Sequence, residues 1–237
     1  MAHFLNTTDP EFESRFRALL SLKREDAPDV NQVVAGIIAD VRARGDEALV
    51  ELTAKYDDLE LEPDEFTVSE EEVETAISGI GSHEREALQL AASRIRAYHE
   101  RQRPEDALWT DEAGATLGWR WSPVKSAGLY VPGGQASYPS SVLMNAIPAQ
   151  VAGVERLVMT VPAPHGKLSP LVLMAARLSG IDTIHRLGGA QAVAALAYGT
   201  DTVVPVDKIT GPGNAYVAAA HRPALGPVGT DTTARPP

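Results

Sequence analysis

The 237-residue sequence contains no cysteine, and aromatic residues make up only 5% of it. The absence of cysteine excludes disulfides, thiolate nucleophiles and cysteine-ligated zinc from this chain. Because aromatic side chains are sparse, the core must consist mainly of Ala, Val, Leu and Ile, which belong to the 44% of residues that are hydrophobic. In a chain of this length, that fraction is enough for one sizeable core or two modest ones.

Positive charge is also in short supply. Lys and Arg number 21 against 32 Asp and Glu, which gives a formal net charge of −11. Sequence-independent nucleic-acid binding needs a basic surface that displaces counterions, and anionic membrane surfaces attract the same basic segments. We therefore expect neither nucleic acid nor a membrane among the partners.

Long apolar runs are missing as well. No stretch approaches the roughly 18 consecutive apolar residues of a membrane span. The N-terminal segment MAHFLNTTDPEFESRF lacks the basic region and the apolar region of a secretory signal. The expected location is therefore the cytoplasm.

The usual catalytic and metal-binding motifs are absent from the sequence. The six histidines show no HExxH motif and no pair four residues apart, and they stand at positions 3, 83, 99, 165, 185 and 221. We therefore expect no metal site in this chain. His185 falls inside an expected strand, where a packed residue is the simplest interpretation. No serine stands in a G-x-S-x-G motif, which disfavours a serine hydrolase.

Residues 1–122 are expected to form a mainly helical region. Asp9 is a plausible N-cap before Pro10, and further helices are expected to end near Gly45 and to begin at Asp46. Ser69-Glu70-Glu71-Glu72 has the form of a capping box. Near the end of this region, Leu117, Trp119 and Trp121 alternate with Gly118 and Arg120, which predicts a half-buried strand.

From residue 123 onward, β-type runs alternate with Ala-rich helical runs. The expected strands cover 128–131, 156–161, 183–187 and 203–210, and each is followed by a helical segment. Ser169 as N-cap, Pro170 at the first helical position and Gly180 at the end mark one of these helices. Four such pairs predict a parallel sheet covered by helices on both faces, which is a Rossmann-like domain over residues 123–222.

Three glycine-bearing turns follow strands of this expected sheet: Gly133-Gly134, Gly188-Gly189 and Gly211-Pro212-Gly213. Such turns can expose backbone N–H groups to an anion at a helix N-terminus. Alternatively, glycine is required only because the chain turns there with positive φ. Three turns at one edge favour a ligand crevice. The local sequences GPGNAY and HGKLS do not complete a dinucleotide motif or a P-loop.

Three side chains next to these turns are candidates for ligand contact. Tyr130 ends an expected strand and can stack on a ligand or hydrogen-bond to it; the alternative is an aromatic residue at a domain edge. Gln191 lies in the first turn of an expected helix, where it can face the crevice or simply be solvated. Asn214 can cap the following helix, a role that does not exclude ligand contact.

Three longer segments resemble histidinol dehydrogenase. They are GLYVPGGQASYPSSVLMNAIPAQVAGV (128–154), GGAQAVAALAYGT (188–200) and VDKITGPGNAYVAAA (206–220). They occur in the order found in that family, and the segment DVRARGDEALVELTAKYD (40–57) resembles it too. The resemblance covers about residues 10 to 222.

The resemblance implies a specific chemistry. The family oxidises L-histidinol through the aldehyde to L-histidine with two NAD, in the last step of histidine biosynthesis, as a zinc-dependent homodimer. Tyr130, Gln191 and Asn214 occupy the family's NAD-contacting positions. The resemblance therefore predicts NAD and L-histidinol as small-molecule partners.

The resemblance also implies that part of the family's machinery lies outside this chain. Members of the family continue well beyond this length, and their zinc ligands and Glu-His acid–base pair belong to the later part. No catalytic residue and no zinc ligand is therefore expected here. Residues 223–237 fit the family pattern poorly and are expected to form an aberrant or disordered tail of a truncated chain. The alternative to an enzyme by descent is a non-catalytic remnant or dinucleotide-binding fragment.

Overall fold

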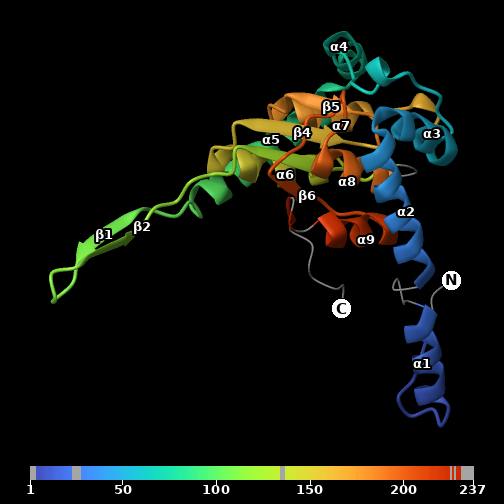
Figure 1. The fold of residues 1–237 in the computed structure, drawn as a ribbon, viewed down its shortest axis with the longest axis horizontal. Helices are drawn as coiled ribbons and strands as arrows, with labels where there is room; N and C mark the ends of the chain where they lie inside the picture. Colours follow the sequence, from blue (N-terminus) through green and yellow to red (C-terminus); the bar gives the residue numbers. More distant parts are fainter. Residues whose placement is uncertain (1–3, 23–27, 134–136, 225, 227, 231–237) are drawn as a thin grey trace.

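The structure is a computed structural model that describes residues 4–22, 28–133, 137–224, 226 and 228–230. Its N-terminal part is helical, as expected. In chain order the elements are α1 (Phe12–Leu22), α2 (Pro28–Arg44), α3 (Asp46–Asp57), the short 3-10 helix η1 (Pro63–Glu65), α4 (Glu70–Ser78) and α5 (Ser82–Glu100). Figure 1 shows α1 apart from the body of the molecule and α2 beside α8 and α9.

The expected helix boundaries agree with the structure except at the first helix. The capping box of α4 is present, since the Ser69 hydroxyl accepts from the Glu72 N–H at 3.2 Å and the Glu72 carboxylate accepts from the Ser69 N–H at 2.9 Å. The first helix starts later than expected. Asp9 and Pro10 lie in a turn, where the Asp9 carboxylate accepts from the Glu11 N–H, and α1 begins at Phe12.

Among the described residues, a five-stranded parallel sheet forms the centre of the molecule. Its strands are β3 (Ser126–Tyr130), β4 (Arg156–Thr160), β5 (Thr183–His185), β6 (Lys208–Thr210) and β7 (Gly229–Thr230). They are ordered β5-β4-β3-β6-β7, and every neighbouring pair is parallel. This is the strand order of the doubly wound Rossmann fold, which confirms the expected fold class.

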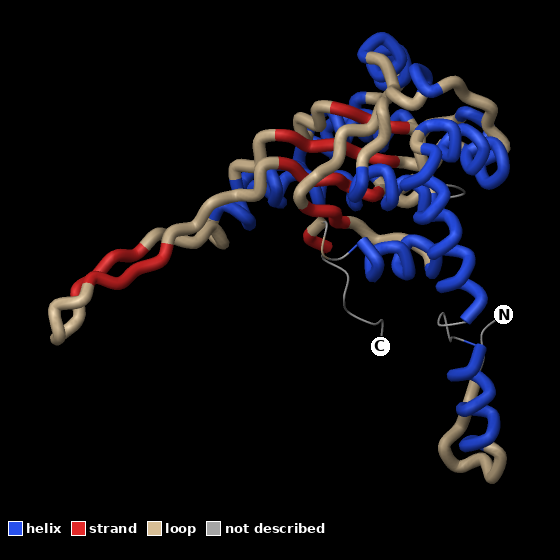
Figure 2. The backbone as a smooth tube through the Cα atoms, in the orientation of Figure 1, coloured by secondary structure: helices blue, strands red, loops and turns tan. Residues whose placement is uncertain are grey.

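Helices cover both faces of this sheet (Figure 2). The crossover helices are α6 (Pro139–Ala152), α7 (Pro170–Leu178), α8 (Gly189–Tyr198) and α9 (Ala215–Ala224), with the 3-10 helix η2 (Pro164–Gly166) before α7. The helix α6 packs against α7, and α8 against α9. The N-terminal helices form an outer cover. The helix α2 packs on α8 and α9, α4 packs on α7, and α5 packs on α6 and α7. The expected regions 1–122 and 123–222 therefore share hydrophobic clusters.

The N-terminal region also pairs with the edge of the sheet. The Val68 N–H donates to the Ile184 carbonyl and the Arg186 N–H to the Phe66 carbonyl, both at 2.8 Å. Between them, Thr67 bridges His185 in antiparallel fashion, and its hydroxyl lies 3.2 Å from the His185 Nδ1. His185 is 3% exposed, which confirms it as a packed residue.

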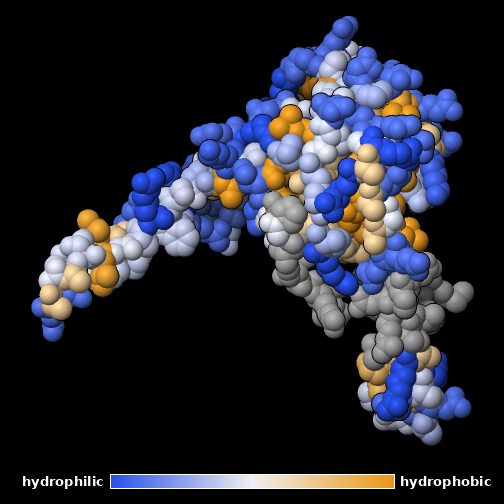
Figure 3. All heavy atoms as spheres, viewed as in Figure 1, coloured by the Kyte–Doolittle hydropathy of each residue, from blue (hydrophilic) through white to orange (hydrophobic). Residues whose placement is uncertain are grey.

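The expected strand near Trp119 forms, but it is exposed and not half-buried. The strands β1 (Ala107–Thr110) and β2 (Thr116–Trp119) make an antiparallel ribbon that projects from the body (Figure 1). Every residue of β2 is exposed, because β1 is its only sheet partner among the described residues. Trp109 and Trp119 pack edge to face with ring centroids 5.2 Å apart. Apolar side chains are consequently visible on the ribbon surface (Figure 3).

The expected strand over 203–210 was wrong in its first half. Pro205 has no N–H to donate, and the Val206 N–H donates to the Leu196 carbonyl of α8 instead of a neighbouring strand. The strand β6 is therefore confined to Lys208–Thr210. Downstream, the described part of segment 223–237 contains the end of α9 and the strand β7, which pairs with β6.

His185 is expected to make the stability of the fold depend on pH. Burial lowers its pKa from 6.5 to about 4, so the unfolded chain binds this proton more readily than the folded one. The contribution is complete above pH 6.5 and is lost as the pH falls toward 4, by about 3 kcal/mol at most. Urea denaturation across this range should show the loss in the wild type and in H165Q, an exposed-histidine control, and less of it in H185Q. If the free energy of unfolding of H185Q fell with pH as steeply as that of the wild type, the pH dependence would not come from His185.

Asp46 is expected to anchor α3 to the loop before β6. It is 9% exposed and accepts from the Thr202 N–H at 3.0 Å and from the Thr202 hydroxyl at 2.9 Å. D46A removes the charged acceptor of both hydrogen bonds and should lower the free energy of unfolding by about 1–3 kcal/mol. E47A, on the exposed side of the same turn, should change it by less than about 0.5 kcal/mol. Urea midpoints measure both, and equal effects would argue against the anchor.

Candidate functional site

A cavity of about 730 Å³ opens at the carboxyl edge of the sheet. Its volume is in the range of small-molecule and cofactor sites. The sheet domain contributes Tyr130, Pro132, Gly133, Pro162, Pro164, Gly189, Ala190, Gln191, Asn214 and Tyr216, and the N-terminal helices contribute Val33, Ile37, Lys55, Tyr56 and Asp57. All three residues predicted to contact the cofactor therefore line one cavity.

The cavity lies at the point where the order of the strands in the sheet reverses. The strands β3 and β6 are neighbours, yet the chain leaves β3 toward α6 and β4 and leaves β6 toward α9 and β7. Ligands of doubly wound folds bind outside the carboxyl ends of the strands at this switch point. Tyr130 is the last residue of β3, and Asn214 follows β6 after the turn 211–213.

Tyr130 connects the end of β3 to the start of α8. The side chain is 4% exposed, and its hydroxyl oxygen accepts from the Gly189 N–H at 3.1 Å. Burial raises the pKa of Tyr130 to about 12, and the nearby Asp57 carboxylate contributes to the rise. The hydroxyl is therefore protonated at neutral pH and keeps its hydrogen available as a donor.

Gln191 presents an unsatisfied donor to the cavity. The residue is 1% exposed, and its Nε2 is buried with no hydrogen-bond partner in the described part of the chain. Burying an amide without a partner is costly, so such a group calls for a ligand atom that accepts from it. The alternative of a solvated helical glutamine does not hold, because the first turn of α8 is covered by the N-terminal helices.

Asn214 fulfils the capping role considered from the sequence. Its Oδ1 accepts from the N–H groups of Tyr216 and Val217, both at 3.1 Å, and so caps α9. The residue is exposed and lies at the cavity wall. Capping uses its carbonyl oxygen.

The glycine turns are explained by close approach of chain segments. A Cβ at Gly133 would lie 2.5 Å from the Pro162 carbonyl oxygen, and one at Gly188 would lie 2.5 Å from the Pro162 Cβ. Gly189 and Gly211 have φ of +62° and +125°, which L side chains rarely adopt. The conformational alternative thus holds for these turns, and Gly133 and Gly189 line the cavity as well. Gly134 lies outside the described residues.

Three cavity residues from the end of α3 were not predicted from the sequence. Lys55 places its Nζ 4.9 Å from the centroid of the Tyr56 ring, which brings a positive charge to the cavity rim. Asp57 is 9% exposed, its Oδ2 has no hydrogen-bond partner among described atoms, and burial raises its pKa. From the sequence, an acidic residue at the end of a helix is expected to be solvated. Only the packing of α3 shows that Asp57 is enclosed.

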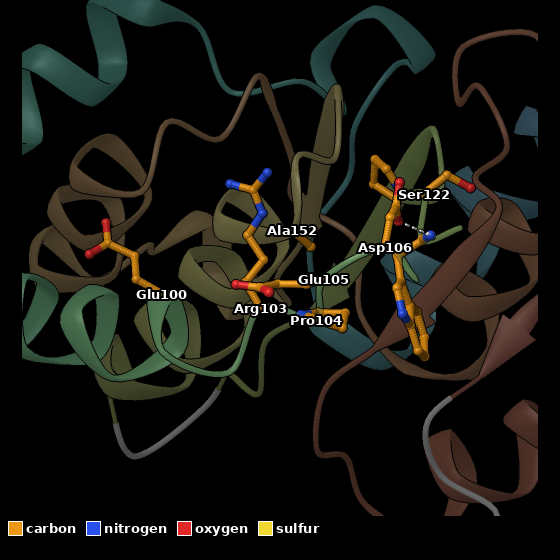
Figure 4. A pocket seen from close by; sticks show the side chains of 9 residues that line it. Glu100, Arg103, Pro104, Glu105, Asp106, Ser122 and Ala152 are labelled. Carbon is orange, nitrogen blue, oxygen red and sulfur yellow. Dashed lines mark hydrogen bonds between the residues drawn. The ribbon is translucent and has the colours of Figure 1, made fainter. Parts of the chain in front are cut away.

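A second hollow, of about 690 Å³, lies at the base of the projecting ribbon (Figure 4). Its lining includes Glu100, Arg103, Glu105 and Asp106, and the Asp106 carboxylate accepts from the Trp121 N–H at 2.7 Å. None of the buried unpaired polar atoms of the described chain belongs to this lining. The cavity at the sheet edge is therefore the better candidate site.

The described residues contain neither a metal-binding cluster nor a membrane-spanning helix. Within these ranges, no group of three or more His, Cys, Asp or Glu side chains is placed to hold a metal ion. No helix of the same ranges combines the length and the apolar character needed to cross a bilayer.

Comparisons with known proteins identify the family to which the chain is similar. The family model for histidinol dehydrogenase matches residues 20–237, which includes the segment 223–237. The chain is 67% identical over 236 residues to histidinol dehydrogenase from Cereibacter sphaeroides and 64% identical to that from Ruegeria pomeroyi, covering 100% of this chain and 54% of each relative.

A solved structure supports the same relationship. The crystal structure of histidinol dehydrogenase from Elizabethkingia anophelis matches with a TM-score of 0.84 and 35% identity, over 89% of this chain and 48% of that chain. The present chain thus spans about half the length of the curated relatives it matches. On the sequence match and the shared fold, this chain belongs to the histidinol dehydrogenase family.

Proposed function

We propose that this chain forms the NAD-binding part of a histidinol dehydrogenase. The observation that carries the proposal is the convergence of Tyr130, Gln191 and Asn214 on one cavity at the switch point of the sheet. These three positions are the ones that the family resemblance assigns to NAD. The buried Nε2 of Gln191, which lacks a partner among the described residues, is a donor that a bound dinucleotide would satisfy.

The surroundings of the cavity suit a dinucleotide. The first turns of α8 and α9 border it through Gly189, Ala190 and Tyr216, and helix N-termini favour the negative charge of a pyrophosphate. Lys55 adds a cation at the rim. The Tyr130 hydroxyl and the Gln191 amide can both donate to ligand oxygens. When bound, NAD supplies the hydride acceptor, and the role of these residues is to hold and orient it.

The complete reaction is part of the proposal. It is the oxidation of L-histidinol through L-histidinal to L-histidine with two NAD, carried out by a cytoplasmic homodimer. In this proposal the zinc ligands and the acid–base pair lie outside this chain. The isolated chain therefore binds NAD without turning substrate over.

The alternative is a non-catalytic chain that binds a dinucleotide. It is favoured by the cavity being lined from both the sheet and the N-terminal helices of this one chain. The two functions share the NAD site. They differ in whether a complementary C-terminal segment restores oxidation of L-histidinol.

Binding of NAD is expected to depend on the Gln191 amide. Q191L removes the donor and replaces the buried amide with an apolar side chain of similar size. It should weaken NAD binding about fivefold, the value of one hydrogen bond of about 1 kcal/mol, when measured by calorimetry. Q102A, at an exposed glutamine beyond α5, is the control and should bind NAD as the wild type does. Wild-type affinity in Q191L would remove Gln191 from the NAD site.

The isolated chain is expected to form no NADH from L-histidinol, with or without added zinc. The reason is that this proposal places the groups that bind the substrate and move its protons outside the chain. NADH absorbance measures the reaction, with full-length histidinol dehydrogenase from Cereibacter sphaeroides as the positive control. Turnover by the isolated chain would place the catalytic groups within residues 1–237.

A further inference from the structure

Asp57 is a buried acid in the candidate cavity to which neither the motifs nor the family resemblance assigned a role. It is the last residue of α3 and is 9% exposed. Its Oδ2 is buried without a hydrogen-bond partner in the described chain, and the residue lines the same cavity as Gln191. A carboxylate enclosed in this way is unfavourable unless a donor completes it. The cavity therefore lacks a donor at this point.

The missing donor is not an ion-pair partner within the described residues. The neighbouring Lys55 directs its ammonium group over the Tyr56 ring, and Asp58 pairs with His165 at 3.1 Å. Desolvation raises the pKa of Asp57 in the absence of a compensating cation. A neutral donor on a ligand, such as a hydroxyl group, would satisfy the carboxylate without introducing a second charge.

The position of Asp57 in the fold indicates which hydroxyl this is. A Cβ at Gly188 would lie 3.2 Å from the Asp57 Oδ2 and 2.5 Å from the Pro162 Cβ, so the carboxylate lies near Pro162. Pro162 comes two residues after Thr160, where β4 ends. The strand β4 is the second strand of the doubly wound order, and in Rossmann domains the acid that binds the adenosine ribose follows this strand.

In this chain the acid does not come from the sheet domain. The residues after β4 are Val161, Pro162 and Ala163, none of which carries a carboxylate. Asp57, from a helix about a hundred residues earlier in the sequence, reaches the corresponding place from outside the sheet. The local dinucleotide motif is incomplete in sequence, yet its acidic element is present in space.

We propose that the Asp57 carboxylate accepts a hydrogen bond from the 2′-hydroxyl of the adenosine ribose of NAD and disfavours NADP, whose 2′-phosphate would face a negative charge. This inference rests on the proposed function, since it requires NAD in this cavity. It assigns cofactor specificity to an N-terminal helix, whereas the family resemblance assigned contacts only to Tyr130, Gln191 and Asn214.

The test measures the affinities of the full chain for NAD, NADP and 2′-deoxy-NAD by calorimetry. The wild type should bind NAD about tenfold or more tightly than 2′-deoxy-NAD, as expected for a hydrogen bond to a charged group, and more tightly than NADP. D57N keeps the size of the side chain and removes its charge. It should weaken NAD binding about tenfold and narrow the difference between NAD and NADP.

The control is D58N. It removes the same charge one residue away, at an exposed position with φ of +51° that asparagine tolerates. D58N should keep the wild-type preference for NAD over NADP. Thermal unfolding checks that D57N folds. Because the pKa of Asp57 is raised in the folded state, its ionised form opposes folding at neutral pH, and D57N should unfold at the same or a higher temperature.

The outcomes separate the two proposals. A wild-type chain that binds none of the three ligands would overturn the proposed function and this inference together. A wild type that binds NAD, with a D57N variant of unchanged affinity and unchanged preference, would overturn the role of Asp57 alone. Equal affinity of the wild type for NAD and 2′-deoxy-NAD would do the same without relying on any variant.

Discussion

The parallel pairing of β3 with β6 is the constraint on which the rest of the structure depends. It joins segments about eighty residues apart, with Ala127 opposite Lys208 and Leu129 opposite Thr210. At the start of the pair, the N–H and the hydroxyl of Ser126 both donate to the Asp207 carboxylate at 2.8 Å, which fixes the register. The Ser126 hydroxyl also holds the pKa of Asp207 below its ordinary value.

The same pairing determines where the site forms. Gly128 lies at the middle of β3, where a Cβ would come within 3.0 Å of Leu196 and Val206, so its absence lets α8 lie close to the sheet. At the far end of the pair, Gly211 passes so near the Tyr130 carbonyl that only glycine fits. The two strand ends, and the residues that follow them, therefore meet at the switch point.

Much of this arrangement could be predicted from the sequence, because its signals are local. Strand-like runs followed by Ala-rich helices predict the doubly wound sheet, and the Ser69 box predicts the start of α4. The resemblance identified Tyr130, Gln191 and Asn214, which the fold brings to one cavity. The exposure of β2 could not be predicted, since alternation shows a two-sided strand but not whether anything covers it.

The burial of Gln191 and Asp57 also depended on information that is not local. Each is a polar residue at a helix end, a position that is usually solvated, and each is enclosed only because α2 and α3 pack over α8. Similarly, residues 203–207 have β-type composition, but Val206 is committed to a hydrogen bond with α8. Tertiary packing overrides local preference at these points.

The cavity wall is built from two parts of the chain that are far apart in the sequence, the N-terminal helices and the sheet domain. This construction has one further consequence. Val33 and Tyr56 belong to helices that lie on the outside of the sheet domain, while Tyr130 and Gln191 belong to the domain itself. A ligand that contacts both parts would bind the state in which α2 and α3 are packed against the sheet domain. It would therefore stabilise that state. Bound ligand would therefore slow amide hydrogen exchange in these two helices, and a substitution that loosens the contact between α2 and α8 would weaken affinity without altering any lining residue.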